Sequence, residues 1–278
     1  KIVQSHGDIE HFHQSLDYIK YASEEYVILS RSYMICNIDI KKAFREHLKS
    51  DSDITIIYKN VKNDEKYHNL DTLNIGMNNS LIGIGKNAGK LDKINLSMEM
   101  YIMRKDILVK VIEEAVEKGD SNYLKQALFL ELVNHKVSTY KYDGYVACIN
   151  SSKNYYDANM DMLNMDIYEQ LFNNERPIFT KVKDEPSTIY REHSNVKNSL
   201  VANGCDIEGE VVDSIIFRDV HIKEGTKISN SIIMQRSTIE ENCSLNNVIS
   251  DKYVRITRDS VLAGDKKAPY IISKGLTI

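Results

Sequence analysis

Aliphatic residues recur every six positions in the last third of this chain of 278 residues. Two triplets with this spacing superpose at an offset of 17 residues, and the register extends to a third set further along the chain. Its members are Ile216, Ile222 and Ile228, then Ile233, Ile239 and Leu245, then Ile249, Ile256 and Leu262. A six-residue period gives one short strand and one turn per side, and three sides close a coil that must stack on its neighbours to bury its aliphatic face. The repeat predicts a left-handed parallel β-helix.

Polar residues follow the same repeat. The positions expected to stack are Asp213, Asn230 and Asn247 in one row and Gly225, Asn242 and Asp259 in another. An earlier coil is predicted at 194–209, where Val201 and Ile207 lie six residues apart. A helical interpretation cannot explain three coils in one register. We therefore assign residues 194–278 to a β-helix domain.

The preceding part of the chain has a different pattern, in which strands alternate with helices. Apolar runs predict strands at 26–29, 53–58, 95–103, 137–142 and 145–149, the first of them buried on both faces. Helical spacing predicts helices at 7–21, 40–48, 105–119, 123–133 and 153–172, with Asp8 and Asp39 as candidate N-caps. This alternation predicts a largely parallel α/β sheet in residues 1–175. Residues 176–193, which contain Pro177 and Pro186, are assigned to a linker.

Composition limits the classes of partner and the compartment. The net charge of -4 gives no electrostatic reason to expect nucleic acid or an anionic membrane as partner. No apolar run approaches the roughly 18 residues of a membrane span. Cys36, Cys148, Cys205 and Cys243 lie far apart without a CxxC pair, which together with the polar start of the chain predicts reduced thiols in a cytoplasmic protein. Because the sequence does not begin with Met, we expect further residues before residue 1.

Four segments carry a resemblance to the ADP-glucose pyrophosphorylases, which are sugar-phosphate nucleotidyltransferases with a β-helix after an α/β domain. Residues 16–40 resemble the family's helix and strand that lead into its GDH-type loop. Residues 80–103 resemble its sugar-binding E-K-P segment, and residues 145–164 resemble its W-x-D-V-G-T segment with the helix that follows. "RPIFT", residues 176–180, resembles the entry to the β-helix. The resemblance implies a partial mononucleotide-binding, Rossmann-like nucleotidyltransferase domain.

The same resemblance locates the two aspartates with which active members hold Mg²⁺. Tyr33, in "SRSYM", stands where the family reads A-G-D-H, and Cys148, in "VACINS", stands where it reads W-R-D-V-G-T. Mg²⁺ requires hard oxygen ligands, and a phenol and a thiol are poor ones at neutral pH. Phosphate transfer depends on positioning and charge neutralisation. We therefore predict no catalytic residue and no metal or cofactor for this chain. If the chain is one subunit of a larger enzyme, we expect Mg²⁺ to be bound only by the catalytic subunit.

Other family motifs are partly retained. The E-K-P motif reads "GKN", so Lys86 could still contact a sugar phosphate, although a solvated loop lysine is the alternative. Ser97 matches the family's serine that faces the sugar, or is a packing residue. The R-G-T-A-D-A motif reads "HGDIEH" and keeps Gly7. These three residues are the candidate vestigial substrate-binding residues. The family's G-G-x-G-T-R-L loop would precede residue 1, so the sequence does not determine whether ATP binds.

The histidines indicate no second site. His11 and His13 lie two positions apart on a predicted helix, where their side chains point in different directions. His221 lies in a regular coil. Acyltransferases with this repeat use a histidine base between coils, but the α/β domain of this chain fits that family poorly. Asp64, Glu65 and Lys66 indicate an exposed loop.

The resemblance is greatest to the non-catalytic, GlgD-type subunits of bacterial glucose-1-phosphate adenylyltransferase. It implies a degenerate subunit that joins the catalytic subunit, as a heterotetramer, and modulates synthesis of ADP-glucose from ATP and glucose 1-phosphate for glycogen. A sugar-phosphate effector is a further expectation, and the β-helix is expected to supply much of the subunit contact. Two alternatives stay open. One is an active adenylyltransferase that recruits Asp39 or Asp143 for the metal; the other is a homo-oligomeric ligand-sensing protein.

Overall fold

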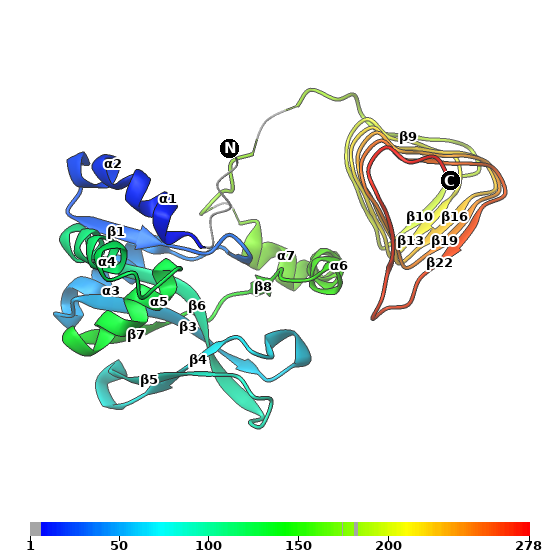
Figure 1. Cartoon of the computed structure of the whole chain (residues 1–278). Helices are drawn as coiled ribbons and strands as arrows, with labels where there is room; N and C mark the ends of the chain where they lie inside the picture. Colours follow the sequence, from blue (N-terminus) through cyan, green and yellow to red (C-terminus); the bar gives the residue numbers. More distant parts are fainter. Residues whose placement is uncertain (1–6, 174, 181–182) are drawn as a thin grey trace. The chain divides into compact units, whose positions relative to one another are not determined.

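The computed structural model describes residues 7–173, 175–180 and 183–278, which fall into two compact units (Figure 1). The first, here called the α/β unit, runs through Met34 and from Ile38 to Gly144. The second, the solenoid unit, comprises Ile35–Asn37 and Tyr145–Ile278. This division differs from the predicted boundary at residue 175, because two helices and a short sheet group with the solenoid.

The α/β unit contains a six-stranded mixed sheet with the order β5-β4-β6-β3-β7, in which β1 also pairs with β6. Its strands are β1 (Tyr26–Leu29), β3 (Ile54–Lys62), β4 (Asp71–Ile75), β5 (Leu81–Lys86), β6 (Lys93–Arg104) and β7 (Val137–Lys141). Only the pairing of β3 with β7 is parallel within this described sheet. The predicted largely parallel sheet is therefore wrong. Residues 76–80 and 87–92, which connect β4 to β5 and β5 to β6, are too short for the crossover that parallel strands require.

Helices cover both faces of this sheet. The helices of the α/β unit are α1 (Ile9–Gln14), α2 (Leu16–Tyr21), α3 (Ile40–Ser50), α4 (Lys105–Lys118) and α5 (Leu124–Glu131), with 3-10 turns at Glu65–Tyr67, Met77–Asn79 and Leu132–Asn134. On one face, Ile54 and Ile56 of β3 share a core with Tyr101 of β6, Ile112 of α4 and Leu128 of α5. Helices α1 and α2 add Ile9, Phe12, Leu16 and Ile19 to that core. On the opposite face, α3 reaches Thr55 of β3 through His47.

Two local predictions for this unit need correction. The helix predicted over 7–21 is divided at Ser15 into α1 and α2. The strand at 26–29 is not buried on both faces, since β1 pairs with β6 along one edge and Ile28 is 39% exposed. The predicted end of the helix at Gly119 is confirmed, because Gly119 has φ 64° and closes α4 in the left-handed conformation.

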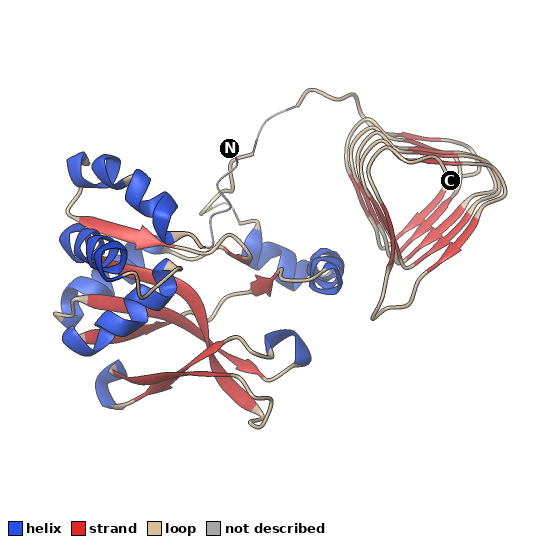
Figure 2. Cartoon of the chain, in the orientation of Figure 1, coloured by secondary structure: helices blue, strands red, loops and turns tan. Residues whose placement is uncertain are grey.

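The solenoid consists of three parallel sheets of five short strands each, stacked coil on coil into a triangular outline (Figure 1). Figure 2 shows that its sides are strands joined by turns. One sheet contains β9 (Ile189–Tyr190), β12 (Asp206–Ile207), β15 (His221–Ile222), β18 (Thr238–Ile239) and β21 (Arg255–Ile256). The second contains β10 (Asn195–Lys197), β13 (Glu210–Val212), β16 (Lys227–Ser229), β19 (Ser244–Asn246) and β22 (Val261–Ala263). The third contains β11 (Leu200–Val201), β14 (Ile215–Ile216), β17 (Ile232–Ile233), β20 (Val248–Ser250) and β23 (Tyr270–Ile272).

The sequence repeat predicts most of the solenoid register. Ile222, Ile239 and Ile256 pair in line, as do Ile228, Leu245 and Leu262. Ile249 departs from the prediction: it pairs with Ile232, and Ser250 takes the inward position opposite Ile233. Ile249 instead packs with Ile232 and with Tyr156 outside the coils. The first strand of the solenoid lies before the predicted start of the β-helix. This strand, β9, falls within the stretch assigned to a linker and pairs with β12.

Left-handed backbone conformations explain the repeated polar residues. All six residues of the two predicted rows have φ between 46° and 73°. Asn, Asp and Gly enter this region at the least steric cost, so the turns between the sides select them. The structure thus gives these residues a conformational role.

The remaining elements of the second unit precede the solenoid. They are the paired strands β2 (Met34–Cys36) and β8 (Val146–Cys148), the helices α6 (Ser152–Met160) and α7 (Met165–Leu171), and a 3-10 turn at Asp161–Leu163. The helix predicted over 153–172 is therefore divided. Tyr156 of α6 donates a hydrogen bond to the carbonyl oxygen of Asn230 at 2.8 Å, which ties α6 to the coils. Across the described residues of the chain, none of the helices has the length and apolar character needed to cross a membrane.

His47 of α3 gives the α/β unit a pH-dependent stability. Its side chain is 2% exposed, and Nδ1 lies 2.7 Å from the hydroxyl of Thr55. Burial lowers the pKa of His47 below its usual 6.5. At higher pH the ring is neutral in both states. As pH falls through about 6.5, the unfolded chain binds a proton that the folded chain does not, so the free energy of unfolding decreases.

We expect this decrease to reach up to about 1.4 kcal/mol for each pH unit below about 6.5. Urea unfolding at pH 7.5 and pH 5.5, compared between the wild type and His47→Gln, measures it. The variant should lose less stability on acidification than the wild type. His13→Gln on the exposed surface of α1 is the control and should behave as the wild type. Equal acid sensitivity of His47→Gln and the wild type would contradict the assignment.

Candidate functional site

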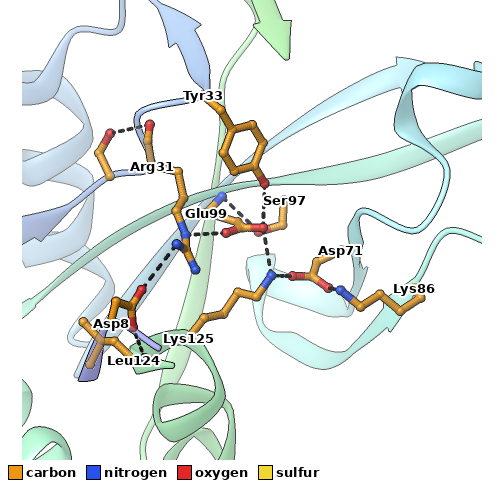
Figure 3. Close-up of polar contacts among 10 residues, drawn as sticks. Asp8, Arg31, Tyr33, Asp71, Lys86, Ser97, Glu99, Leu124 and Lys125 are labelled. Atoms are coloured by element: carbon orange, nitrogen blue, oxygen red, sulfur yellow. Dashed lines mark hydrogen bonds and ion pairs between the residues drawn. The ribbon is translucent and has the colours of Figure 1, made fainter. Parts of the chain in front are cut away.

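A cluster of charged side chains gathers around Glu99 of β6 (Figure 3). We call it the Glu99 cluster; its members are Asp8, Arg31, Tyr33, Asp71, Lys86, Glu99 and Lys125. Five parts of the α/β unit supply them: the segment before α1, the loop after β1, the paired strands β4 and β5, the long strand β6, and the first turn of α5. Only the tertiary fold brings them together.

Glu99 is the centre of the cluster and its side chain is 4% exposed. One carboxylate oxygen accepts hydrogen bonds from the hydroxyl of Tyr33 at 2.8 Å and from Nζ of Lys125 at 2.9 Å. The other accepts from Nε of Arg31 at 2.8 Å. An irregularity in the strand directs the carboxylate here: Ile57 pairs with Met100 but Tyr58 pairs with Ser97, so Met98 and Glu99 are bulged out of the pairing with β3. Glu99 has φ 48° at this bulge.

Asp71 extends the cluster to a second buried carboxylate, which is 1% exposed. Its two oxygens each bind one ammonium group, Lys86 at 2.6 Å and Lys125 at 2.7 Å. Burial alone would lower the pKa of Lys125, but its hydrogen bonds with Asp71 and Glu99 outweigh burial and raise that pKa. Lys125 is therefore a permanent cation that joins the two carboxylates.

Asp8 completes the cluster in a role that differs from the prediction. Asp8 occupies the predicted N-cap position of α1, but its side chain makes no capping hydrogen bond to that helix. Its carboxylate accepts instead from the backbone nitrogen of Leu124 at 2.6 Å, at the start of α5, and from Arg31 at 3.4 Å. A carboxylate is favourable at a helix N-terminus, where backbone N–H groups lack partners.

The charges of the cluster cancel. Three cations, Arg31, Lys86 and Lys125, face three carboxylates, Asp8, Asp71 and Glu99. Each of these carboxylates is within 3.4 Å of at least one of the cations. An additional ion entering the cluster would have to replace one of these partners.

Several residues predicted from the sequence converge on this cluster. Tyr33 binds Glu99 directly, and Lys86 binds Asp71 directly. The hydroxyl of Ser97 accepts a hydrogen bond from the backbone nitrogen of Glu99 at 3.2 Å, and Ser97 is 2% exposed. The structure thus places Ser97 as a support of the bulge. A contact of Ser97 or Lys86 with substrate stays a prediction.

Gly7 lies beside the cluster, and the structure shows why this position has no side chain. A Cβ at Gly7 would lie 1.8 Å from the carbonyl oxygen of Asn122. The next turn of the chain is fixed to the same carbonyl, since the backbone nitrogen of Ile9 donates to it at 3.2 Å. Gly7 therefore permits the close approach that places Asp8 at the start of α5.

Gly7→Ala is expected to destabilise the α/β unit by about 1–3 kcal/mol, because the added methyl group must displace the loop that carries Asn122. Urea unfolding followed by far-ultraviolet circular dichroism measures the change. Gly83→Ala is the matched control, since nothing lies within 4 Å of a Cβ at Gly83. If the Gly7→Ala protein is as stable as Gly83→Ala, the loop that carries Asn122 moves without loss of stability, and the prediction is wrong.

The other residues singled out for the metal lie outside the cluster. Cys148 is the last residue of β8, in the solenoid unit, and is 4% exposed. Asp39 caps α3 by accepting from the backbone nitrogen of Lys42 at 2.8 Å. Asp143 binds Lys141 at 2.7 Å, and this hydrogen bond lowers the pKa of its carboxyl group. Within the described residues, no three His, Cys, Asp or Glu side chains form a group that could hold a metal ion.

The Glu99 cluster does not fit Mg²⁺. The metal needs several free hard oxygens. Here the oxygens of Glu99 and Asp71 are bound to two ammonium groups, a guanidinium and a phenol, all at 2.9 Å or less. A dication would also be repelled by Arg31 and Lys125.

A cavity of about 230 Å³ opens beside the cluster. Its walls include Phe12, Arg31, Glu99, Tyr101 and Lys125. Tyr101 is 4% exposed, and its hydroxyl has no hydrogen-bond partner in the described part of the chain. Burial, and then the nearby carboxylates of Glu99 and Asp71, raise the pKa of Tyr101, so the phenol stays a neutral donor.

Sequence reasoning missed Arg31, Asp71, Glu99 and Lys125. Glu99 did leave a signal: it is the one acidic residue in the apolar run "NLSMEMYIM". A lone acid in a buried strand indicates a buried ion pair. The other three gave no local signal, because the ion pairs of Arg31 and Lys125 with Glu99, and of Lys125 with Asp71, join positions far apart in the sequence.

Comparison with known proteins gives the family. Over 270 residues, the chain is 35% identical to the glycogen biosynthesis protein GlgD of Bacillus subtilis strain 168, an alignment that covers 97% of this chain and 68% of the relative. The chain belongs to the GlgD family. It is also 34% identical to the GlgD protein of Geobacillus stearothermophilus over 293 residues, which again covers 97% of this chain and 68% of the relative.

More distant relatives of this GlgD-family chain carry the name of an enzyme. A glucose-1-phosphate adenylyltransferase of Bacillus cytotoxicus is 26% identical over 270 residues, with 96% of this chain and 71% of the relative covered. Residues 185–272 match the family described as GlmU-like, C-terminal hexapeptide. The predicted resemblance and the hexapeptide repeat are confirmed.

Proposed function

We propose that this chain acts in glycogen biosynthesis as a non-catalytic subunit. It associates with glucose-1-phosphate adenylyltransferase and modulates the synthesis of ADP-glucose from ATP and glucose 1-phosphate. Its membership in the GlgD family and its more distant similarity to the adenylyltransferase support this proposal. The Mg²⁺ of the reaction would be held by the catalytic partner.

The bond between Tyr33 and Glu99 is the observation that carries the non-catalytic role. Tyr33 stands where the resemblance places the first metal aspartate, and its hydroxyl donates to Glu99 at 2.8 Å. The carboxylates nearest to Tyr33 are neutralised by Lys and Arg side chains. At this position the chain therefore has a hydrogen-bond donor, Tyr33, next to two cations, Arg31 and Lys125. Metal-assisted nucleotidyl transfer requires free oxygen acceptors there instead.

The last coil of the solenoid supports association with a partner. Several of its large apolar side chains are exposed: Val261, Tyr270, Ile271 and Leu276. Large apolar side chains that are exposed in this way are typical of a protein–protein contact.

The test is an assay of pyrophosphate release from ATP and glucose 1-phosphate with Mg²⁺. We expect the full-length protein alone to give no turnover above background. Mixed with the adenylyltransferase of the same organism, it should co-elute with the enzyme in size-exclusion chromatography and change its rate or its response to effectors. An Ile271→Asp variant that folds normally should weaken this co-elution.

Robust turnover by the protein alone would overturn the proposal in favour of an active adenylyltransferase. A homo-oligomer that neither binds the enzyme nor changes its rate would overturn it in favour of a separate ligand-sensing protein.

A further inference from the structure

Asp71 has the least exposed carboxylate of the Glu99 cluster, at 1%, yet it lies between two lysines that solvent can reach (Figure 3). The side chain of Lys86 is 61% exposed and that of Lys125 is 21% exposed. Each lysine binds a different oxygen of Asp71, at 2.6 and 2.7 Å. The carboxylate thus bridges two ammonium groups.

Two lysines that share one oxyanion are a common arrangement for binding a phosphate group, to which Lys offers a compact point charge. Lys125 has a second partner besides Asp71, and the backbone of Lys86 is fixed by its strand. Lys125 is also held by Glu99 at 2.9 Å, and Lys86 ends strand β5, which is paired with β4 from Asp71 to Ile75. Without the charge of Asp71, three cations would face two carboxylates, leaving one positive charge at the lysine pair.

We propose that Asp71 is an internal anion that takes the place of a phosphate group between Lys86 and Lys125, and so excludes phosphate monoesters from this site. The proposal deepens the proposed function and rests on it, because a subunit that leaves catalysis to its partner has no need to bind a phosphorylated substrate here. Asp71 is thereby a specificity-determining residue: with it present, an incoming dianion meets a neutral cluster.

The test is titration of the full chain with inorganic phosphate and, separately, with glucose 1-phosphate, by isothermal titration calorimetry. The wild type is expected to show no saturable binding of either at millimolar concentration. Asp71→Asn removes the charge, and Asp71→Ser, titrated in parallel, also empties the space between the lysines. At least one of them should bind phosphate saturably, at least about tenfold more tightly than the detection limit at which the wild type shows no binding.

The two ligands separate the sources of the anion. Equal affinity for both would show a site for the phosphate group alone, and tighter binding of glucose 1-phosphate would show a phosphate-monoester site; both support the proposal. Lys86→Met added to Asp71→Asn should abolish the gain. Folded Asp71→Asn and Asp71→Ser proteins that both bind neither ligand would overturn the proposal.

Asp143→Asn is the matched control, since Asp143 is an exposed carboxylate paired with Lys141 at 2.7 Å. An equal gain in this variant would trace the effect to net charge and overturn the proposal. If one of the two Asp71 variants does not fold, as judged by circular dichroism, the other decides the test. The wild type tests the proposal by itself as well: saturable phosphate binding that Lys86→Met removes would show that Asp71 does not exclude the anion.

These measurements are independent of the catalytic partner. Failure of Asp71→Asn to bind phosphate leaves the proposed subunit role intact. Turnover by the wild type alone would overturn that role whatever Asp71→Asn binds.

Discussion

Glu99→Gln is expected to lower the free energy of unfolding of the α/β unit by about 3 kcal/mol, within the range for breaking a buried ion pair. The amide keeps the shape of the side chain and the same backbone conformation at φ 48°, so the change isolates the charge. It leaves Arg31 and Lys125 each with one fewer carboxylate, at distances of 2.8 and 2.9 Å. Urea unfolding followed by far-ultraviolet circular dichroism measures the loss.

Glu113→Gln provides the matched control. Glu113 lies on α4 and pairs with Lys20 at 2.6 Å, but both side chains are exposed, at 49% and 38%. An exposed pair of this kind is screened by solvent and contributes little to stability. Similar losses in the two variants would show that the Glu99 cluster has no special weight in the stability of the unit.

Ile239→Ala is expected to destabilise the solenoid by about 3–4 kcal/mol, because it opens a cavity in a core that cannot collapse around it. Ile239 is fully buried and pairs with Ile222 on one side and Ile256 on the other. The loss therefore affects two interfaces between coils. Hydrogen exchange of the solenoid amides, measured by mass spectrometry, should rise on both sides of β18 and leave the α/β unit unchanged.

The control for this substitution is Val261→Ala, in which an aliphatic side chain of the same solenoid is shortened where it is 75% exposed. Its effect should stay within about 0.5 kcal/mol. Exchange that rises only at β18 itself in Ile239→Ala would contradict the nearest-neighbour account of the solenoid.

The two halves of the chain differed in how far the sequence predicted them. The solenoid follows from its repeat because the stacking partner of Ile222 is the residue one coil later, Ile239, so the sequence itself contains the register. The sheet of the α/β unit does not follow in this way. Strands β4 and β5 were not predicted, since Asn74, Gly83 and Gly85 weaken their strand pattern, and the directions of the neighbouring strands depend on them.

The candidate site was predicted only in outline. Tyr33, Lys86, Ser97 and Gly7 were found by resemblance and all lie in or beside the Glu99 cluster. The partners that determine its chemistry were not found. Arg31 lies 68 residues from Glu99 in sequence, and only packing of the loop after β1 against β6 joins them. Ion pairs of this kind are set by the tertiary fold, and local sequence patterns do not record them.

The register of the solenoid has a consequence for insertions and deletions in this family. Along one side of the coils, Leu200 pairs with Ile215, Ile215 with Ile232, and Ile249 with Ile271, so the chain takes a different number of residues to return to this side in each of these coils. The paired sides stay in line while the coils differ in length, and the turns therefore absorb every added residue. Segments such as 264–269, between β22 and β23, are thus where the chain can acquire new loops without disturbing the stacked sides.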